Sequence, residues 1–419
     1  MKVLISGGGI AGPALAFWFA KLGYNVTVVE RFPRLRTNGL QIDLRESGVE
    51  VLKRMGLEEA FRAKAVEEAG TQLVDSSGKR RAWFPATKQP GSFTSEYEIM
   101  RGDLCQLFYN ATKESVEYVF GTWITSFEEN EQHVKVNFAN GTTDNFDLLV
   151  GADGQNSRTR KMMLGSDVPD AFHPFRDVTA YYSIRRPVQE GEEFVATMYV
   201  TTGNRAMMTR RTSPDKLLVY AGGAEPEELK DIRPGDVEAQ KKALCKMYKG
   251  AGWITEELLE AAKDSTDFHC ERLGMVKLDS WYKGRVVLVG DAAYCPSANT
   301  GMGTTLSVLG AYILAGEIGK RCGRGDRLAA NGATNRKTNL LAAFDAYERT
   351  LRPFTDFVQG GVPKEGGSAW FPTSAFGIWA AYLIMGVASA LRINLLGAMF
   401  IQRTPKGWET PDYSQVFSL

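Results

Sequence analysis

The chain has 419 residues, of which 44% are hydrophobic and 24% charged, so it can form one large core or two to three packed units. Its 50 basic and 49 acidic residues leave a net charge of +1, which provides no electrostatic footprint for nucleic acid and no polybasic stretch for an anionic membrane. We therefore expect a small-molecule partner and no nucleic acid.

The cysteines and the N-terminus indicate the compartment. The five cysteines are scattered along the chain, and neither a Cys-x-x-Cys motif nor a Cys/His cluster with metal-ligand spacing occurs. This pattern predicts a reducing compartment and no metal. The opening letters MKVLISGGG leave no room for a signal peptide before the glycines, so the expected location is cytoplasmic.

The first 30 residues have the pattern of a strand–helix–strand unit. Lys2–Ser6 is a short apolar strand, and the glycine turn after it leads into a helix over Pro13–Leu22. Asn25–Glu30 is a second buried strand, rich in Val and Thr. A parallel sheet should begin here.

The next segments alternate between helices and short strands. Helices are expected over Glu46–Met55 and over residues 101 to 113, and short antiparallel strands over Gln72–Ile99. A hairpin over Val134–Asp147 should turn at Asn140 and Gly141, a pair that favours a tight turn.

A second β-rich stretch over Val178–Gly222 is followed by a charged helical run over Glu225–Ala262, a strand over Val286–Val289 and an apolar helix from about Thr304. This order predicts an α/β fold in which a nucleotide-binding sheet is interrupted by β-rich insertions. We expect a discontinuous Rossmann-type domain, an inserted β-sheet domain and a C-terminal helical segment. Their ranges are 1–71 with 101–171 and 271–350, then 72–100 with 172–270, and finally 351–419.

The segment Gly366–Leu391 contains no charged residue and is long enough to span a bilayer. Its glycine, serine and proline content favours a helix packed against protein, and membrane association through 366–391 is the less favoured alternative. The side chains that suit such packing are Trp370, Phe371, Ile378, Tyr382 and Met385.

The strongest motif is Gly7-x-Gly9-x-x-Gly12, followed by Glu30 at the end of the second strand. In such a unit Gly7 permits a tight turn, Gly9 lets the backbone approach a pyrophosphate, and Gly12 lets helix and strand pack closely. Glu30 would accept hydrogen bonds from an adenosine ribose. The motif indicates a dinucleotide but does not separate FAD from NAD.

Two later segments separate these cofactors. Each is a strand that runs into a polar or glycine-rich loop: DLLVGADGQNSRTR (Asp147–Arg160) and GDAAYCPSANTGMG (Gly290–Gly303). Together with the glycine motif, they resemble the dinucleotide, DG and GD motifs of the class A flavoprotein monooxygenases, the para-hydroxybenzoate hydroxylase-like family. The segments NGLQIDLR (Asn38–Arg45), RGDL (Arg101–Leu104) and GAYILAGE (Gly310–Glu317) resemble the branch of tetracycline-inactivating monooxygenases and polyketide aromatic hydroxylases.

The resemblance implies an FAD site. It places Arg101 and Asp291 near the pyrophosphate and ribityl chain, Arg45 beside the isoalloxazine or its phosphates, and Asp153–Gly154 in a motif used for FAD and pyridine nucleotide. Capping roles for the two aspartates and surface ion pairs for the two arginines are the alternatives. The cofactor-binding candidates are Gly7, Gly9, Ala11, Gly12, Glu30, Arg31, Arg45, Arg101, Asp153, Gly154, Asp291, Pro296, Gly301, Met302 and Gly303.

The loop before the last helix departs from the family pattern, since Ala298 stands where the family commonly has proline. Asn299 would offer a polar contact to flavin or substrate. Backbone N–H groups over Gly301–Gly303 can stabilise negative charge on a reduced flavin.

The resemblance also implies the reaction. NADPH or NADH binds transiently and reduces FAD, O2 forms a flavin C4a-hydroperoxide, and one oxygen atom enters an electron-rich substrate such as an aromatic or polycyclic secondary metabolite. Few protein acids or bases are then obligatory, and Arg45 is the one catalytic candidate, none being certain in a flavin-mediated reaction. The substrate candidates on the β-rich insertion are Tyr181, Met198, Met207, Thr209, Arg211, Tyr220 and Phe268.

Several readings stay open at this point. An FAD-dependent oxidase or reductase of the same fold, a membrane-associated monooxygenase acting on a terpenoid or lipophilic polyketide, and a flavin-binding scaffold without turnover are the alternatives. The sequence does not distinguish hydroxylation from epoxidation or Baeyer–Villiger insertion.

Overall fold

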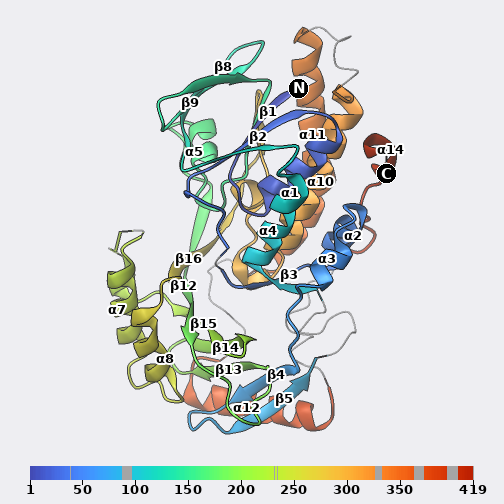
Figure 1. Ribbon diagram of the computed structural model, residues 1–419. Coiled ribbons are helices and arrows are strands. Elements are labelled where there is room, and N and C mark those ends of the chain that lie inside the picture. Colours follow the sequence, from blue (N-terminus) through green and yellow to red (C-terminus); the bar gives the residue numbers. More distant parts are fainter. Residues whose placement is uncertain are drawn as a thin grey trace.

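The computed structural model describes residues 1–37, 39–86, 97–230, 232–233, 235–325, 333–362, 372–393 and 404–418. Two sheets organise this part of the chain, one at each end of the molecule (Figure 1). Asn38, Trp370 and Phe371, which the sequence analysis names, lie outside the described residues.

The first sheet is parallel apart from one edge strand, β17. β1 lies at its centre between β11 and β2, and Ser6 pairs with both Gly151 and Val29, so the carboxyl ends of the three strands meet. A ligand crevice forms outside such strand ends in open parallel sheets. In spatial order the strands are β17 (Tyr282–Lys283), β18 (Val286–Leu288), β11 (Leu148–Gly151), β1 (Lys2–Ser6), β2 (Asn25–Glu30) and β7 (Glu117–Phe120).

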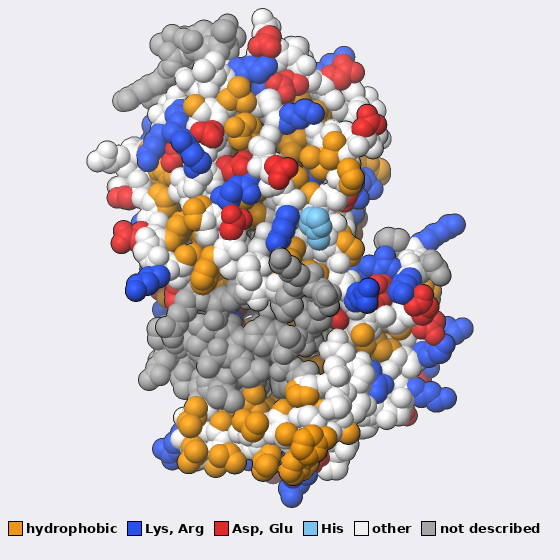
Figure 2. Space-filling view, turned by 180° about the vertical axis from the view of Figure 1, so that it is seen from behind, with side chains coloured by type: hydrophobic (Ala, Val, Ile, Leu, Met, Phe, Trp, Pro, Cys, Tyr) orange, Lys and Arg blue, Asp and Glu red, His pale blue; other side chains and the backbone are white. Residues whose placement is uncertain are grey.

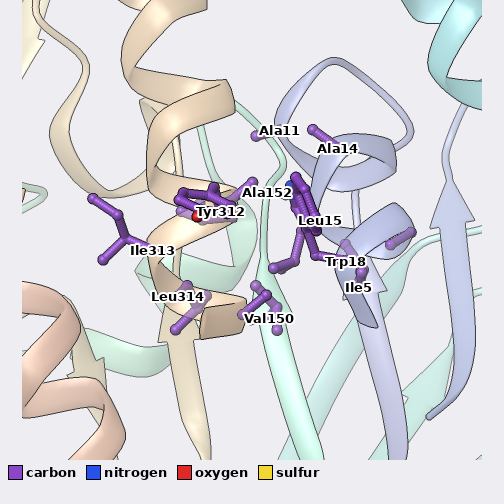
Figure 3. Packing of buried hydrophobic residues seen from close by; sticks show 14 of the residues in the cluster. Ile5, Ala11, Ala14, Leu15, Trp18, Val150, Ala152, Tyr312, Ile313 and Leu314 are labelled. Atoms are coloured by element: carbon purple, nitrogen blue, oxygen red, sulfur yellow. The ribbon is translucent and has the colours of Figure 1, made fainter. Parts of the chain in front are cut away.

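Helices pack on this sheet and form the main core. α1 (Ala11–Lys21) is apolar on all sides because it lies between the sheet and α10 (Gly303–Cys322). Figure 3 shows Leu15 and Trp18 of α1 facing Tyr312 of α10. The ring centroids of Trp18 and Tyr312 are 5.0 Å apart. The other helices around this sheet are α2 (Glu46–Arg54), α3 (Glu58–Arg62), α4 (Arg101–Thr112), α5 (Arg158–Leu164), α9 (Asp291–Tyr294), η2 (Ala298–Thr300), α11 (Ala333–Gly360) and α14 (Ser414–Phe417).

The second sheet has seven strands and combines segments from distant parts of the sequence. Its strands pair antiparallel, except that β13 pairs in parallel with β4. In spatial order they are β16 (His269–Val276), β12 (Phe172–Arg185), β15 (Lys216–Ala224), β14 (Arg205–Ser213), β13 (Ala196–Thr201), β4 (Gly70–Val74) and β5 (Arg80–Pro85).

Each region of the second sheet has its own helical cover. Four short helices pack over β12 and β15 around the buried side chains of Tyr182 and Val219: α6 (Glu227–Lys230), α7 (Val237–Met247), α8 (Thr255–Ala261) and η1 (Ala262–Asp264). α12 (Ala375–Ala390) packs over β4, β5 and β13, at the lower end of Figure 1. None of the described helices combines the length and apolarity needed to cross a bilayer.

Two small sheets complete the architecture. β3 (Gln41–Asp43) pairs with β6 (Glu98–Met100), and β8 (Ile124–Glu129) pairs with β9 (Val134–Phe138), which in turn pairs with β10 (Thr143–Phe146).

The predicted local elements agree closely with the structure. β1 and β2 have the predicted bounds, and α1 begins at Ala11, two residues before the predicted start. β9 and β10 form the predicted hairpin, with Gly141 at φ +83°. The short antiparallel strands predicted over Gln72–Ile99 are β4 and β5, which pair with each other, and β6, which pairs antiparallel with β3 in a separate small sheet. α11 continues without a break through residue 350.

Candidate functional site

A cavity of about 740 Å³ extends from the glycine turn after β1 to the face of the second sheet. One end is bordered by strand ends and glycine loops of the first sheet, and the other by β12, β13, β14 and β15. The cavity therefore connects the glycine loops of the first sheet with the face of the second sheet.

The glycine turn forms the floor of the first end. Gly7 has φ +117°, and a Cβ on Gly7 would stand 2.4 Å from the carbonyl oxygen of Ala152, so only glycine lets β1 turn beside β11. Gly9 borders the cavity, and the only atom within 4 Å of a Cβ placed there belongs to the side chain of Arg101. The backbone N–H of Gly8 donates to Glu30 Oε2 at 2.8 Å, which holds Glu30 at the rim.

Two arginines bring positive charge to this turn. Arg36 and Arg101 both border the cavity, and Arg101 Nη1 is buried with no hydrogen-bond partner among the described residues. Burial, together with the charge of Arg101, lowers the pKa of Arg36. Two neighbouring cations in a buried place are stabilised by an anion, and the glycine turn beside them offers backbone N–H groups. Arg36 was not among the predicted site residues, because it belongs to no recognisable motif.

Arg45 lies further along the cavity, beside the loop before α10. A Cβ on Gly301 would stand 3.4 Å from Arg45 Nη2, and Gly301 has φ +62°. Arg45 Nε donates to Asp43 Oδ2 at 2.5 Å, and its backbone N–H donates to Thr305 Oγ1 at 2.9 Å. Asp43 Oδ1 is buried with no partner among the described residues. Asp43 was also missed, since it stood inside a quoted motif without a role.

Asp291 is the first residue of α9 and borders the cavity. Burial, with a contribution from the negative charge of Glu271, raises its pKa to about 6. A carboxylate held in such a place gains from hydrogen-bond donors supplied by a ligand. A Cβ on Gly303 would stand 3.6 Å from Asp291 Oδ1, which places Asp291 beside the N-terminus of α10.

Asp153 acts as a cap. Its Oδ1 accepts from Ser157 Oγ at 2.5 Å, and its Oδ2 accepts from the backbone N–H groups of Arg158 and Thr159 at 2.9 and 3.0 Å. It also borders the cavity. These hydrogen bonds show that Asp153 caps the N-terminus of α5, which is the alternative role expected for it from the sequence.

The cavity brings together most of the predicted cofactor residues. Gly12 and Met302 lie away from it: a Cβ on Gly12 would meet the carbonyl oxygen of Gly7, and Met302 is buried in the main core. Ala298 and Asn299 border it as well. The predicted residues that border the cavity are Gly7, Gly9, Ala11, Glu30, Arg31, Arg45, Arg101, Asp153, Gly154, Asp291, Pro296, Gly301 and Gly303.

The predicted substrate residues divide between the two faces of the second sheet. Tyr181, Met198, Met207 and Tyr220 border the cavity, although Met207 also packs in the cluster under α7 and α8. Thr209, Arg211 and Phe268 do not border it. Successive side chains of a strand point to opposite faces of the sheet, and these three lie on the face away from the cavity. Thr209 and Arg211 line a separate hollow of about 260 Å³, and Phe268 stacks on Tyr182.

A buried charged network stands between the two ends of the cavity. Arg210 donates from Nε and Nη2 to Glu68 at 2.8 and 2.5 Å, and from Nη2 to Glu98 at 2.5 Å. Burial opposes the charge of Arg210, but Glu98 and Glu68 hold its pKa well above the ordinary value. Gln41 Nε2 donates to Glu98, and the backbone N–H of Gln41 donates to Tyr220 Oη at 3.0 Å. Gln41 Oε1 has no partner among the described residues.

The residues at the first end fit FAD. The positive charge of Arg36 and Arg101, with the unpartnered Nη1 beside the close-approach glycines, suits a pyrophosphate. Glu30 stands where an adenosine ribose would lie, and Arg45, Asp43, Asp291 and the N-terminus of α10 surround the remaining length.

Comparison with known proteins supports this fit. The model of the FAD binding domain family matches residues 1–327. The chain is 47% identical to the FAD-dependent monooxygenase asL4 of Sarocladium schorii, over 99% of both chains. It is 38% identical to the flavin-dependent monooxygenase eupH of Phoma sp, over 94% of this chain and 93% of the relative.

Solved structures give the same result. Tetracycline destructase Tet(55) superposes with a TM-score of 0.75 at 27% identity, covering 98% of both chains. The structure of Klebsiella pneumoniae HpxO complexed with FAD and uric acid has the same fold, with a TM-score of 0.66 at 19% identity over 97% of this chain and 98% of that one. The chain is therefore an FAD-dependent enzyme and belongs to the class A flavoprotein monooxygenases.

Proposed function

We propose that this monooxygenase consumes NAD(P)H and inserts one atom of O2 into an aromatic or polycyclic substrate that carries a hydroxyl group. The observation that carries the proposal is the shape of the cavity, in which the predicted flavin cradle continues into a wall of aromatic and methionine side chains next to a buried hydrogen-bond acceptor.

The cradle end binds and positions the cofactor. When bound, FAD supplies the redox chemistry, namely uptake of a hydride equivalent and activation of O2. Arg36 and Arg101 neutralise the pyrophosphate, and Arg45 and Asp43 support the flavin end. The N-terminus of α10, a helix of 20 residues, directs backbone N–H groups and the positive end of the helix dipole at this region, which stabilises negative charge there.

The sheet end holds the substrate. Met198, Met208, Tyr181 and Tyr220 border it and provide a mostly apolar surface for a ring. These side chains also limit the access of water, which protects a reactive oxygen species from side reactions.

Gln41 is the polar anchor. A carboxylate only accepts hydrogen bonds, so Glu98 fixes the Gln41 amide with Nε2 toward it and Oε1 away from it. Among the described residues, Oε1 is then a buried acceptor without a partner, which is unfavourable until a donor arrives. A phenolic or enolic hydroxyl supplies such a donor and belongs to the electron-rich rings that accept electrophilic oxygen.

The test is NAD(P)H-dependent oxygen uptake by the FAD-loaded protein with a panel of phenolic and polycyclic compounds and isotopically labelled O2. The proposal expects substrate-stimulated oxidation and a product heavier by one labelled oxygen atom. Turnover without labelled oxygen in any product would instead support the oxidase or reductase alternative.

A matched pair of variants tests the anchor. Gln41→Leu should raise KM for a hydroxylated substrate by about 10-fold, since a lost hydrogen bond of ~1.5 kcal/mol corresponds to that factor, and should leave the O-methylated analogue almost unaffected. Gln106→Leu, on the exposed side of α4, is the control. If Gln41→Leu raises KM equally for both substrates, Gln41 does not bind the substrate hydroxyl.

A further inference from the structure

The outer face of α12 is the largest unexplained feature of the described surface. Phe376 is 76% exposed, Leu391 65% and Trp379 60%, and the exposed positions recur at the spacing of one helix face. Figure 2 shows hydrophobic side chains gathered at the lower end of the molecule, where Figure 1 places α12. This face consists of Phe376, Trp379, Leu383, Ile384, Val387, Leu391 and Ile393.

The inner face of α12 is held by hydrogen bonds to the second sheet, and this fixes the outer face toward the surface. Tyr382 Oη donates to the carbonyl oxygen of Val74 at 2.8 Å and accepts from the backbone N–H of Val200 at 3.0 Å. Ser389 Oγ donates to the carbonyl oxygen of Trp83 at 2.8 Å and accepts from its backbone N–H at 2.9 Å. As the sequence predicts, Ile378, Tyr382 and Met385 pack against protein.

The outer face is unusual for a protein surface in water. Contiguous exposed apolar patches of this kind mark a contact with another protein or with a membrane. No charged residue occurs from Gly366 to Leu391, so nothing along the described helix interrupts the apolar surface.

The border of the face carries positive charge. Lys79 and Arg81 belong to the turn and strand on which α12 packs, and Arg392 follows the helix directly. The acid of that turn, Asp75, is ion-paired with Arg81 at 2.6 Å, so Arg81 adds no net charge and the positive charge rests on Lys79 and Arg392. An apolar face with a basic border matches an anionic phospholipid surface, where acyl chains receive the apolar side chains and headgroups receive the cations. A second copy docked through the same face would bring like charges together, which disfavours it.

The geometry excludes a spanning arrangement. A helix of 16 residues is about 24 Å long, which is shorter than the roughly 30 Å hydrocarbon core. The bonds of Tyr382 and Ser389 also hold α12 flat against the sheet, so the helix can lie in the interface but cannot cross it.

α12 lies next to the sheet end of the large cavity. Pro372, just before the helix, borders the large cavity, and so do Met198 and Val200, which share a buried cluster with Ile378 and Met385. The inner face of α12 therefore contacts side chains that line the sheet end of the cavity, and the outer face lies on the opposite side of the same helix. An enzyme placed there would meet lipophilic molecules dissolved in the bilayer.

We propose that the outer face of α12 docks on an anionic phospholipid bilayer as an interfacial helix. The proposal goes beyond the oxygenation proposed above and is tested without it. The small net charge of the chain disfavours a membrane partner, but the structure places Arg392 at the end of the apolar helix and Lys79 in the turn that leads into β5, on which α12 packs.

The experiment is flotation of the FAD-loaded full chain with vesicles of phosphatidylcholine, with and without phosphatidylserine. The wild type should float with the phosphatidylserine vesicles. Leu383→Glu and Trp379→Glu should lower its partition coefficient at least about tenfold, since each replaces an apolar contact with a charge. Phe357→Glu, at an exposed position on α11, is the control and should float like the wild type. Arg392→Glu should weaken binding to phosphatidylserine vesicles, and added salt should do the same.

Flavin content and circular dichroism of each variant establish that it is folded. A wild type that stays in the aqueous fraction with both vesicle types would overturn the proposal, and so would binding that neither Leu383→Glu nor Trp379→Glu weakens. Sedimentation velocity tests whether a second copy of the chain binds this face instead. A wild-type dimer that Leu383→Glu dissociates, together with no vesicle binding, would assign the face to a second copy and overturn the proposal.

Discussion

A Cβ on Gly12 would stand 2.0 Å from the carbonyl oxygen of Gly7, so the turn after β1 and the first turn of α1 meet through backbone atoms alone. This contact sets the angle at which α1 leaves the sheet and directs its N-terminus at the cavity. Gly12 does not border the cavity itself, and its contribution to cofactor binding is indirect.

Gly12→Ala should therefore destabilise the protein and reduce its flavin content. Backbone atoms cannot move aside as a flexible side chain can, and overpacking of this kind costs about 1–3 kcal/mol. Thermal unfolding and flavin absorbance per chain measure the two effects. Gly360→Ala is the control, because no atom of the described residues lies within 4 Å of a Cβ placed there. A Gly12→Ala protein with wild-type stability and flavin content would contradict the packing argument.

Arg101→Met should weaken FAD binding by about 10- to 100-fold, the range expected for losing a charged hydrogen bond of ~1.5–3 kcal/mol. Arg101→Lys should lose less affinity, because it keeps the charge but not the two-pronged geometry. Fluorescence titration of the flavin-free protein with FAD measures both. Arg349→Met, at an exposed position paired with Asp345, should bind FAD as the wild type does. Equal affinities for wild type and Arg101→Met would place the pyrophosphate elsewhere.

Asp291→Asn should stabilise the flavin-free protein in a pH-dependent way. The pKa of Asp291 in the folded chain is about 6, above its ordinary value of 3.8, so the folded state disfavours the carboxylate. The resulting penalty is fully present above about pH 6 and fades as the pH falls from 6 toward 3.8. At ~1.4 kcal/mol for each pKa unit the gain at pH 8 is at most about 3 kcal/mol, and smaller for a side chain that is partly open to the cavity.

Urea unfolding of the flavin-free proteins at several pH values tests this prediction. The stability difference between Asp291→Asn and the wild type should shrink below pH 6, and a difference independent of pH would contradict it. Asp345→Asn, on the exposed side of α11, is the control. FAD binding should weaken in Asp291→Asn, because the neutral amide is a poorer acceptor for ligand hydroxyl groups.

Arg210→Met should lower the free energy of unfolding by about 3–5 kcal/mol, because it leaves Glu68 and Glu98 buried without their cation. Adding Glu98→Gln to this variant should restore part of the loss, since one of the two unpaired carboxylates is then removed. Urea unfolding of the single and double variants measures both steps. If Glu98→Gln restores nothing in the Arg210→Met background, the network is not the source of the loss.

The local part of the fold was predictable from the sequence. The apolar run Lys2–Ser6, the glycines after it and Glu30 lie within one strand–helix–strand unit, where short-range geometry determines the result. Asn140 and Gly141 predicted their hairpin for the same reason. The cofactor candidates Arg45, Arg101 and Asp291 come from separate motifs and border one cavity.

The sheet face of the cavity was less predictable. Tyr181 and Tyr220 border it, whereas Thr209 and Arg211 point to the opposite face of the second sheet. Successive side chains of a strand point to opposite faces, so a shift of one residue in the predicted register exchanges the cavity-facing residues for the others. Arg36 belongs to no motif and Asp43 lies in a motif without an assigned role, and only their neighbours Arg101 and Arg45 reveal their place in the site.

The sequence by itself determined a dinucleotide cofactor and the first unit of the fold, because glycine turns and strand periodicity are local properties of the backbone. The resemblance of three motifs to the class A flavoprotein monooxygenases narrowed the dinucleotide to FAD. Only the tertiary structure decided that Gln41, Glu98 and Arg210 meet at the wall of the cavity, and that α12 turns one apolar face inward and the other outward. These contacts join segments from distant parts of the chain, and their energies depend on burial and register, which no local pattern encodes.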